Sequence, residues 1–434
     1  MNSPLNVVVR LMARGNGFAR MGTGEIAFHH SLRVPRDARV GRPRGAAGAK
    51  RRALAAWLSL AAIALPAPGL ATWSIVLTDT RTHEVAIGSA TCVTGIDLLA
   101  ESPVVMVERG AGTAQGIIDA TGHNRALIRQ GLAEGTDPAN VLQLLDAQDR
   151  RHQWRQYVLG DTRGRVAAFT GTRAGAFAGD VSGRVGTVRY AIAGNLLTGP
   201  TVLSEAEQAI VNSTADLPTR LMLAMLAARE QGGDGRCACS PFAPDGCGAP
   251  PAGFAKAAHV GYMVAARAGD TDGSCASAPE GCANGDYYMH LNVGRQETED
   301  LDPVVQLLDR FLLFRARLTA VPDHHRSLVL LSRSTLPADG TSQAIGFIVV
   351  RDVRGKRIRT PGLTLSLSAD AQTSPDSVHI EQPTELAPGV FRFALGAGDT
   401  PGTVTLEVRI EHTDREVTLA PRPTITVIAP GAGD

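Results

Sequence analysis

The sequence contains few aromatic residues and, beyond residue 70, no long uncharged apolar run. Phe, Trp and Tyr make up 4% of the 434 residues, whereas the chain has 47 Gly and 25 Pro. This composition favours short strands and turns, and the length predicts two or three domains. The absence of further apolar runs of membrane-spanning length excludes a polytopic membrane protein.

Most of the chain has fewer basic than acidic residues. Residues 1–71 carry 11 basic and 2 acidic residues, which leaves 32 basic and 40 acidic residues in the rest, a net charge of −8. Nucleic-acid binding depends on basic surfaces that neutralise phosphates. We therefore expect no nucleic-acid partner for a protein without its first 71 residues.

Residues 1–71 are predicted to be a basic leader with a signal peptide. The basic run KRR at 50–52 precedes the apolar segment ALAAWLSLAAIALPAPGLA, as an n-region precedes an h-region. Gly69 and Ala71 provide the small residues at the −3 and −1 positions, so cleavage would make Thr72 the first residue. A membrane anchor is the alternative, and the two prolines of the segment argue against it.

Residues 72–320 alternate blocks of strands with groups of helices. The central strands are apolar on both faces, so both faces are expected to be covered. Grouped helices favour antiparallel sheets, which predicts two stacked sheets with helices outside. The expected strands are 72–79, 85–93, 103–112, 188–197, 259–267 and 287–293, with a hairpin formed by QYVLGD and RVAAFTG. The expected helices include one that begins at TDP (136–138) and others at 204–213, 216–230 and 302–318.

Several segments of this region resemble a known but uncharacterised family, domain of unknown function 1028. They are TWSIVLTDTRTHEVAIGSAT, GAGTAQ, RQYVLGDTRGRVAAFTG, YAIAGNLLTGP and DPVVQLL, in that order. The family looks like the N-terminal-nucleophile (Ntn) hydrolases, which implies an α+β fold, an αββα four-layer sandwich, and a chemical class but no substrate. Cytoplasmic members begin Met-Thr, whereas this chain has a signal-peptidase site before Thr72 and a Cys-rich insertion at about 232–286.

Thr72 is the candidate nucleophile that this resemblance implies. An N-terminal Thr carries nucleophile and base on one residue, because its own α-amine can accept the proton of the attacking hydroxyl. The alternative is a purely structural role, in which Thr72 is only the first residue of a strand, where Thr is common. Lys256 and Lys356 are the only lysines after residue 71, so a lysine that assists the nucleophile is not expected.

Other polar residues accompany Thr72 in the family-like segments. Asn195, in AGNLLTG, is the candidate oxyanion donor, and a strand-end Asn bonded to its own turn is the alternative. Ser74 and Ser89 lie on adjacent strands and could orient the amine or be ordinary core hydroxyls. Asn124 begins a helix and could approach the site or cap that helix. The Arg155-Gln156 pair is expected to have a structural role, as an ion pair.

All six cysteines follow the leader, and an even number in an exported chain predicts disulfides. We expect Cys275 to pair with Cys282 and Cys239 with Cys247, and Cys92 to pair with Cys237 if the insertion folds back onto the second strand. A zinc site and a nucleophilic Cys92 are weaker alternatives, because the chain has no C-x-x-C pair and no activating partner lies near Cys92 in sequence. No cofactor and no metal are expected.

Residues 327–430 show short alternating strands separated by PADG, DVRG, APG and GDTPG. About seven strands without a helical segment predict an all-β immunoglobulin-like sandwich. The opening of this segment is similar to bacterial Ig-like repeats of the invasin and intimin type, which implies a spacer or a surface for a cell-surface partner. His324 and His325 are expected to be solvated in the linker.

Two functions remain open at this point. The first is an exported, periplasmic or extracellular, Ntn-type hydrolase of a small-molecule or peptide amide, with Thr72, Asn195, Ser74 and Ser89 in its site. The second is a non-catalytic extracellular or cell-surface binding protein that keeps the fold as a scaffold. Labelling by a threonine-directed probe would separate the two.

Overall fold

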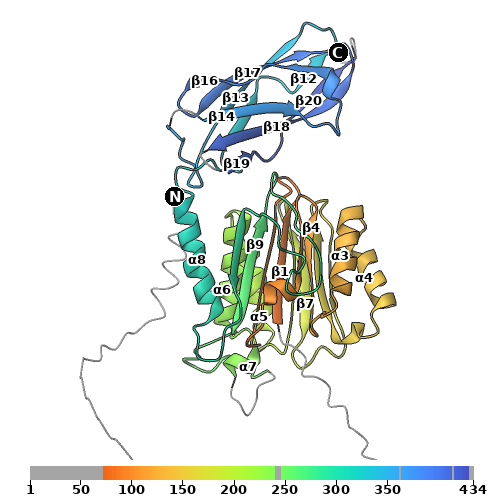
Figure 1. Cartoon of the computed structure of the whole chain (residues 1–434), viewed down its shortest axis with the longest axis vertical. Helices are drawn as coiled ribbons and strands as arrows, with labels where there is room; N and C mark the ends of the chain where they lie inside the picture. The colour runs from red at the N-terminus through yellow and green to blue at the C-terminus, as the bar shows by residue number, and fades with distance from the viewer. Residues whose placement is uncertain (1–71, 240–245, 361–362, 413–414, 430–434) are drawn as a thin grey trace, which may run out of the picture. The chain divides into compact units, whose positions relative to one another are not determined.

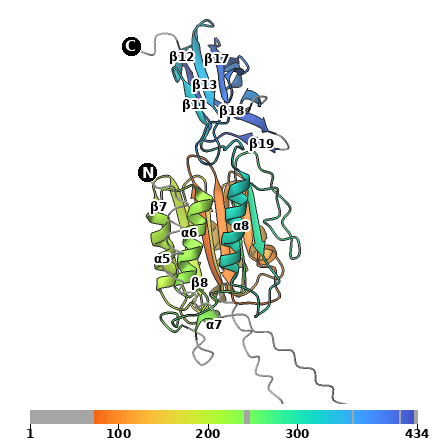
Figure 2. The same ribbon diagram turned by 90° about the vertical axis from the view of Figure 1, so that its left-hand side faces the viewer.

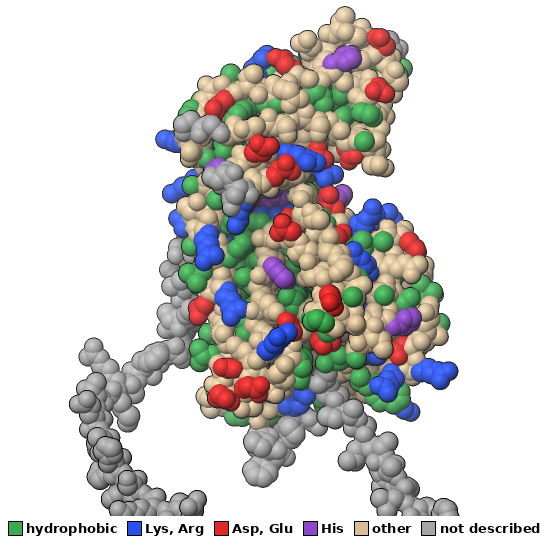
Figure 3. Space-filling view, in the orientation of Figure 1, with side chains coloured by type: hydrophobic (Ala, Val, Ile, Leu, Met, Phe, Trp, Pro, Cys, Tyr) green, Lys and Arg blue, Asp and Glu red, His purple; other side chains and the backbone are tan. Residues whose placement is uncertain are grey.

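The computed structural model describes residues 72–239, 246–360, 363–412 and 415–429. The predicted leader and signal peptide lie outside the described residues. Within those residues, no helix combines the length and the apolar character needed to cross a membrane. Basic and acidic side chains are intermixed on the face shown in Figure 3, without an extended field of one sign.

A six-stranded antiparallel sheet contains the predicted first strand near its centre. All eight residues of β1 and all seven of β2 and β9 are buried, as the apolar runs in the sequence predict. Both faces of these strands are therefore covered. In spatial order the strands are β10 (Met289–Val293), β9 (Val260–Ala266), β2 (Val85–Thr91), β1 (Thr72–Asp79), β8 (Val188–Asn195) and β7 (Gly179–Val185).

A second, four-stranded sheet faces the first. Its antiparallel strands are β3 (Pro103–Met106), β4 (Gly110–Gln115), β5 (Gln156–Asp161) and β6 (Val166–Thr170). The predicted β5–β6 hairpin is confirmed. The single strand predicted at 103–112 is wrong, because the chain reverses between β3 and β4 with Glu108 at a φ of 56°. An apolar run in sequence does not reveal such a reversal.

Helices cover the outer faces of the two stacked sheets (Figures 1 and 2). The sheets meet in one apolar core, in which Val76 and Ile87 of the first sheet pack with Val105 and Val158 of the second. On the four-stranded sheet lie α3 (His123–Glu134) and α4 (Pro138–Gln148), and on the six-stranded sheet lie α5 (Thr201–Val211), α6 (Leu217–Glu230) and α8 (Pro303–Arg317). The short helical segments are α2 (Leu98–Glu101), η1 (His152–Trp154) and α7 (Gly235–Ala238). This part of the chain is therefore a mixed α+β structure.

The helix starts follow ordinary capping chemistry. The predicted start of α4 is confirmed, since Asp137 caps it by accepting from the Ala139 N–H at 2.9 Å and Pro138 occupies its first turn. Asp302 caps α8 in the same way, accepting from Val304 N–H at 2.8 Å. These caps fix the starts of helices that cover the sheets. The candidate site residues Thr72, Ser74, Ser89 and Asn195 lie on strands instead.

The C-terminal region is sheet-rich. One sheet contains β11 (Leu328–Leu331), β13 (Gln343–Val349), β17 (Val390–Ala397), β15 (Val378–Ile380) and β16 (Thr384–Ala387). The other contains β12 (Thr335–Pro337), β20 (Thr424–Ile428), β18 (Gly402–His412), β14 (Thr364–Ala369) and β19 (Arg415–Thr418). Both sheets contribute to one apolar core that includes Phe393 and Val408. The described residues of this region form ten strands rather than about seven. Strands of three or four residues are too short for a period-two pattern to reveal them in the sequence.

The segment between the two regions is less solvated than predicted, since His324 is buried and His325 is half-buried. His324 is 2% exposed rather than solvated, and burial holds the pKa of its imidazole well below the ordinary value. Its neighbour Asp323 forms an ion pair with Arg267 at 3.5 Å, and the His324 ring lies 6.3 Å from that of Tyr288. These contacts depend on residues distant in sequence.

Candidate functional site

Thr72 lies at the first position of β1, directly opposite Asn195, the last residue of β8. The Thr72 N–H donates to Asn195 Oδ1 at 3.2 Å, and Asn195 Nδ2 donates to the Ala174 carbonyl at 2.7 Å. Thr72 is 2% exposed and Asn195 is fully buried. The structure therefore brings two of the sequence-predicted site residues into direct contact.

The two predicted serines form a pair on neighbouring strands. Ser74 lies opposite Ser89, and Ser74 Oγ donates to Ser89 Oγ at 2.8 Å. Ser89 Oγ in turn donates to the Trp73 carbonyl at 2.8 Å, and Ser74 Oγ also contacts Gln115 Oε1. Both serines are fully buried. They support the start of β1 through its backbone and through Gln115.

Two glutamines of the facing sheet complete this network, and sequence reasoning did not assign them to the site. Gln115 ends β4 and Gln156 begins β5, opposite one another. Gln115 Nε2 lies 3.3 Å from the carbonyl oxygens of both Thr72 and Ala193 and 3.1 Å from Gln156 Oε1, so its two hydrogens are shared among three acceptors. Gln156 Nε2 donates to the Gly194 carbonyl at 2.8 Å. Their amides thus connect the two sheets beside Thr72 and Asn195.

One feature of the sequence could have pointed to these two glutamines as site residues. Each is an amide side chain at one end of a strand whose other residues are mostly apolar or glycine, in GAGTAQ and QYVLGD. A buried amide needs hydrogen-bond partners, so such residues mark places where backbones or sites need fixed polar contacts.

A small pocket adjoins Thr72, with room for about one water molecule. Burial raises the pKa of the Glu101 carboxyl in its wall, although Arg125 nearby opposes the shift. The pocket is lined by Thr72, Thr91, Ile96, Leu98, Glu101, Ser102, Ala114, Gln115, Gly116 and Ile118. Apolar side chains, one carboxyl and several polar groups therefore meet at the start of β1.

Other candidates lie apart from this network. Asn124 does not cap α3, whose N-cap residue is Gly122; its side chain donates to Asp149 Oδ2 at 2.6 Å and to the Tyr157 hydroxyl at 3.2 Å. The structural ion pair expected of Arg155 is confirmed, since its Nε donates to the same Asp149 oxygen at 2.8 Å. These residues join α3 and β5 to the loop that follows α4.

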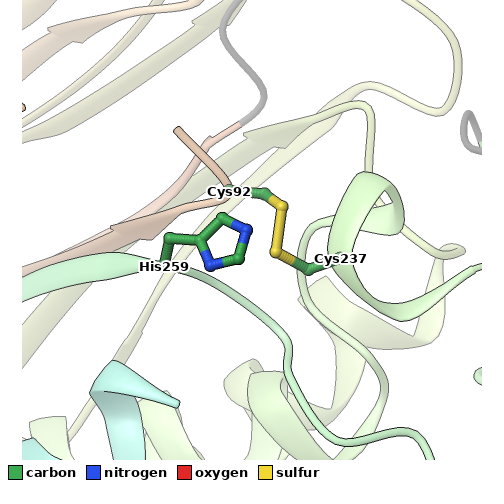
Figure 4. A group of neighbouring side chains, drawn as sticks. All are labelled: Cys92, Cys237 and His259. Carbon is green, nitrogen blue, oxygen red and sulfur yellow. A yellow bond between two sulfur atoms is a disulfide. The ribbon is translucent and has the colours of Figure 1, made fainter. Parts of the chain in front are cut away.

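The three expected disulfides are all present. Cys92 is bonded to Cys237, Cys239 to Cys247 and Cys275 to Cys282. The first joins the end of β2 to α7 across 145 residues. Because Cys92 is in a disulfide, it has no thiol with which to act as a nucleophile. His259 lies beside this first disulfide (Figure 4).

Comparisons with known proteins agree with the resemblance in the N-terminal part. A family model described as a family of unknown function, DUF1028, matches residues 72–242, so its first matched residue is Thr72. No curated protein matches the chain.

Solved structures give weaker likenesses. A Silicibacter pomeroyi protein described by the same family model is 18% identical, with a TM-score of 0.40, over 56% of this chain and 88% of its own. The Yersinia pseudotuberculosis adhesin InvE is 22% identical, with a TM-score of 0.20, over 24% of this chain and 26% of its own. Invasin, a bacterial integrin-binding protein, is 9% identical, with a TM-score of 0.20, over 82% of this chain and 60% of its own. TM-scores this low do not establish a shared fold.

Proposed function

We propose that the protein is an exported N-terminal-nucleophile hydrolase of amide bonds, with Thr72 freed by signal-peptide cleavage. The observation that carries this proposal is the contact between the Thr72 nitrogen and Asn195 Oδ1 within a buried polar network at the start of a central strand. The two stacked sheets with helices on their outer faces support the proposal, because an αββα arrangement is what this class of hydrolases would need. The family match that begins at Thr72 is consistent with it.

The proposed chemistry needs only the residues at this site. Thr72 Oγ attacks the amide carbonyl, and the free α-amine accepts its proton. The tetrahedral intermediate then breaks its C–N bond, and the leaving amine takes the proton. The resulting ester on Thr72 is hydrolysed by water, which the same amine activates, and the carboxylic acid leaves.

In this proposal, the surrounding polar groups hold the backbone of Thr72 in position. Asn195 Oδ1 fixes the nitrogen of Thr72, and Gln115 Nε2 fixes its carbonyl. Such fixed contacts matter because a displacement of about 1 Å can cost on the order of a hundredfold in rate. In the oxyanion role, Asn195 would use its second Nδ2 hydrogen, since the first is donated to Ala174. Ser74 and Ser89 hold Gln115 and the strand backbone in place.

Export is the second element of the proposal. Three disulfides join all six cysteines, and disulfides persist mainly in oxidising compartments such as the periplasm or the extracellular space. Export also supplies the signal peptidase cleavage that would free Thr72. The two elements therefore support one another.

A non-catalytic binding protein is the second candidate, and one observation favours it. Thr72 is 2% exposed and its pocket has room for about one water molecule. A substrate amide can reach Oγ only if cleavage before Thr72 opens this pocket. If it does not, the α+β region is a scaffold, and the sheet-rich region is the surface for a cell-surface partner.

A mechanism-based β-lactone probe tests the proposal on exported protein. We expect one adduct, on Thr72, that is retained in Thr72→Ser and absent in Thr72→Ala. Thr201 of α5, outside the polar network, provides the matched control, and Thr201→Ala should label fully. Folded, correctly processed protein that reacts with none of several threonine-directed probes would overturn the enzyme proposal and favour the binding protein.

A further inference from the structure

Cys92, Cys237 and His259 come together from three distant parts of the chain. Cys92 directly follows β2, Cys237 lies in α7 and His259 directly precedes β9. The two sulfurs and an imidazole nitrogen lie within 4.8 Å of one another. Figure 4 shows a nitrogen-bearing edge of the ring facing the disulfide. Among the described residues, this is the one group of three such side chains whose ligand atoms approach so closely.

Hydrogen bonds hold these three residues together independently of the disulfide. The buried Asp234 carboxylate accepts from the Cys92 N–H at 2.6 Å and caps α7, which contains Cys237. The Asp234 N–H donates to the Ala257 carbonyl at 3.0 Å, and the His259 N–H donates to the Thr91 carbonyl at 2.8 Å. The backbones of all three residues are therefore fixed, so opening the S–S bond would leave the two thiols and the imidazole adjacent.

The imidazole is itself well placed to be a ligand. His259 is 9% exposed, and its Nε2 is the ring nitrogen nearest the disulfide in Figure 4, whereas Nδ1, on the other side of the ring, has no hydrogen-bond partner among the described residues. No comparable third ligand lies as close to the Cys239–Cys247 or Cys275–Cys282 disulfide within the described part of the chain. The absence of a C-x-x-C pair had argued against zinc, but that pattern cannot reveal a site whose members are 145 residues apart.

We propose that reduction of the Cys92–Cys237 disulfide creates a metal site in which the two thiolates and His259 bind Zn²⁺ or a similar ion. Two thiolates and one imidazole are a ligand set that zinc favours, and three protein ligands leave a fourth position for water. The three ligands are not members of the Thr72 network, but they adjoin it, because Thr91, which accepts from the His259 N–H, also lines the pocket beside Thr72. The metal site does not depend on the proposed hydrolase activity.

The redox step is an ordinary thiol–disulfide exchange with a dithiol reductant. One thiolate of the dithiol attacks one sulfur, the S–S bond breaks, and the other sulfur leaves as a thiolate. The second thiol of the reductant then displaces the first protein sulfur, so the dithiol becomes a disulfide and the protein gains two electrons and two thiols. Metal binding releases the thiol protons.

The backbone positions of Cys92 and Cys237 are compatible with both the disulfide and the metal-bound state. The Cα atoms of Cys92 and Cys237 are 5.7 Å apart, within the usual range for a disulfide. Two Zn–S bonds of about 2.3 Å at a tetrahedral angle place the sulfurs about 3.8 Å apart. Rotation of the two cysteine side chains can provide this separation while the hydrogen bonds of Asp234 and His259 hold the backbone.

Cobalt titration of the full chain tests the site, because Co²⁺ reports both tetrahedral geometry and thiolate ligation in its absorption spectrum. Oxidised protein and protein reduced with dithiothreitol, freed of reductant without air, are compared. We expect the reduced protein to bind one equivalent with thiolate-to-cobalt absorption, and the oxidised protein to bind none at this site. Equal uptake in both states, or no uptake by the reduced protein, would overturn the proposal.

Substitutions of the three proposed ligands test which residues bind the metal. Cys92→Ser/Cys237→Ser should abolish the thiolate absorption, whereas the matched pair Cys275→Ser/Cys282→Ser should retain it. His259→Gln, which keeps the disulfide for folding, should weaken cobalt binding after reduction by more than the roughly 10–100-fold typical of a lost second-shell partner. Unchanged cobalt affinity in His259→Gln, or retained thiolate absorption without Cys92 and Cys237, would contradict the assignment.

Discussion

The α+β region and the sheet-rich region bury their strands in different ways. Every residue of β1 is buried, and hydroxyl and amide side chains lie hydrogen-bonded between its sheet and the facing one. In the sheet-rich region, β13 and β18 alternate between buried and more exposed residues. A buried polar group is costly unless it is hydrogen-bonded. The α+β region therefore contains a buried, hydrogen-bonded polar network between its sheets, whereas the sheet-rich region is built around an apolar core.

The largest expected effect is a loss of stability caused by a substitution that creates a cavity in the core of the sheet-rich region. Phe393, in β17, is 1% exposed, and Phe393→Ala should lower the free energy of unfolding by about 3–5 kcal/mol. Phe347 of β13, 37% exposed, is the matched control, and Phe347→Ala should change it by less than about 1 kcal/mol. Thermal denaturation measures both. If the two regions are independent, the reactivity of Thr72 in folded Phe393→Ala is unchanged; its loss would show that the regions share a core.

The next largest expected effect is the loss of stability when a buried hydrogen bond is removed, compared with the loss when an exposed one is removed. Gln115→Leu removes the donor to the Thr72 and Ala193 carbonyls, and should destabilise the protein by about 1–3 kcal/mol. The control is Thr403→Val, which removes an exposed 3.2 Å contact with Thr426 in the sandwich and should change stability by less than about 0.5 kcal/mol. Chemical denaturation of both variants tests the contrast. Equal costs would mean that the buried network contributes no more than a surface contact.

The smallest effect is a pH dependence at His324, between the two regions. Burial lowers the pKa of His324 in the folded state, with Arg267 and His325 acting in the same direction. The unfolded chain therefore binds the proton first, and stability is lost as the pH falls below the ordinary value of about 6.5, by up to about 1.4 kcal/mol per pH unit. His324→Gln should remove this part of the slope between about pH 7.5 and 5.5. Identical slopes in denaturant titrations would show that His324 is not buried neutral.

The same comparison explains what the sequence could predict. Apolar runs predicted the buried strands, and local capping predicted α4, because both depend on neighbours in sequence. The presence of disulfides followed from an even cysteine count in a chain predicted to be exported. The strand reversal at Glu108 and the extra edge strands did not follow, because a short turn leaves almost no periodic signal.

The candidate site was predictable only in part. Thr72, Asn195, Ser74 and Ser89 were predicted from a cleavage pattern and from family-like segments, and they lie in two contacting pairs. Gln115, which links the pairs, was not assigned, because its partners lie on the facing sheet. The arrangement of His259 beside a disulfide likewise depends on folding that brings distant segments together.

The N-terminal sequence of the exported protein tests the central claim most directly. Cleavage after Ala71 should give Thr-Trp-Ser-Ile, with the free amine on the residue whose nitrogen contacts Asn195. A shift of one residue would displace the hydroxyl by about 3.3 Å along the strand and separate nucleophile from base. A mature protein that begins at Thr72 is the predicted result. One that begins at Ala71 or Trp73, or that retains its leader, would contradict the N-terminal-nucleophile account.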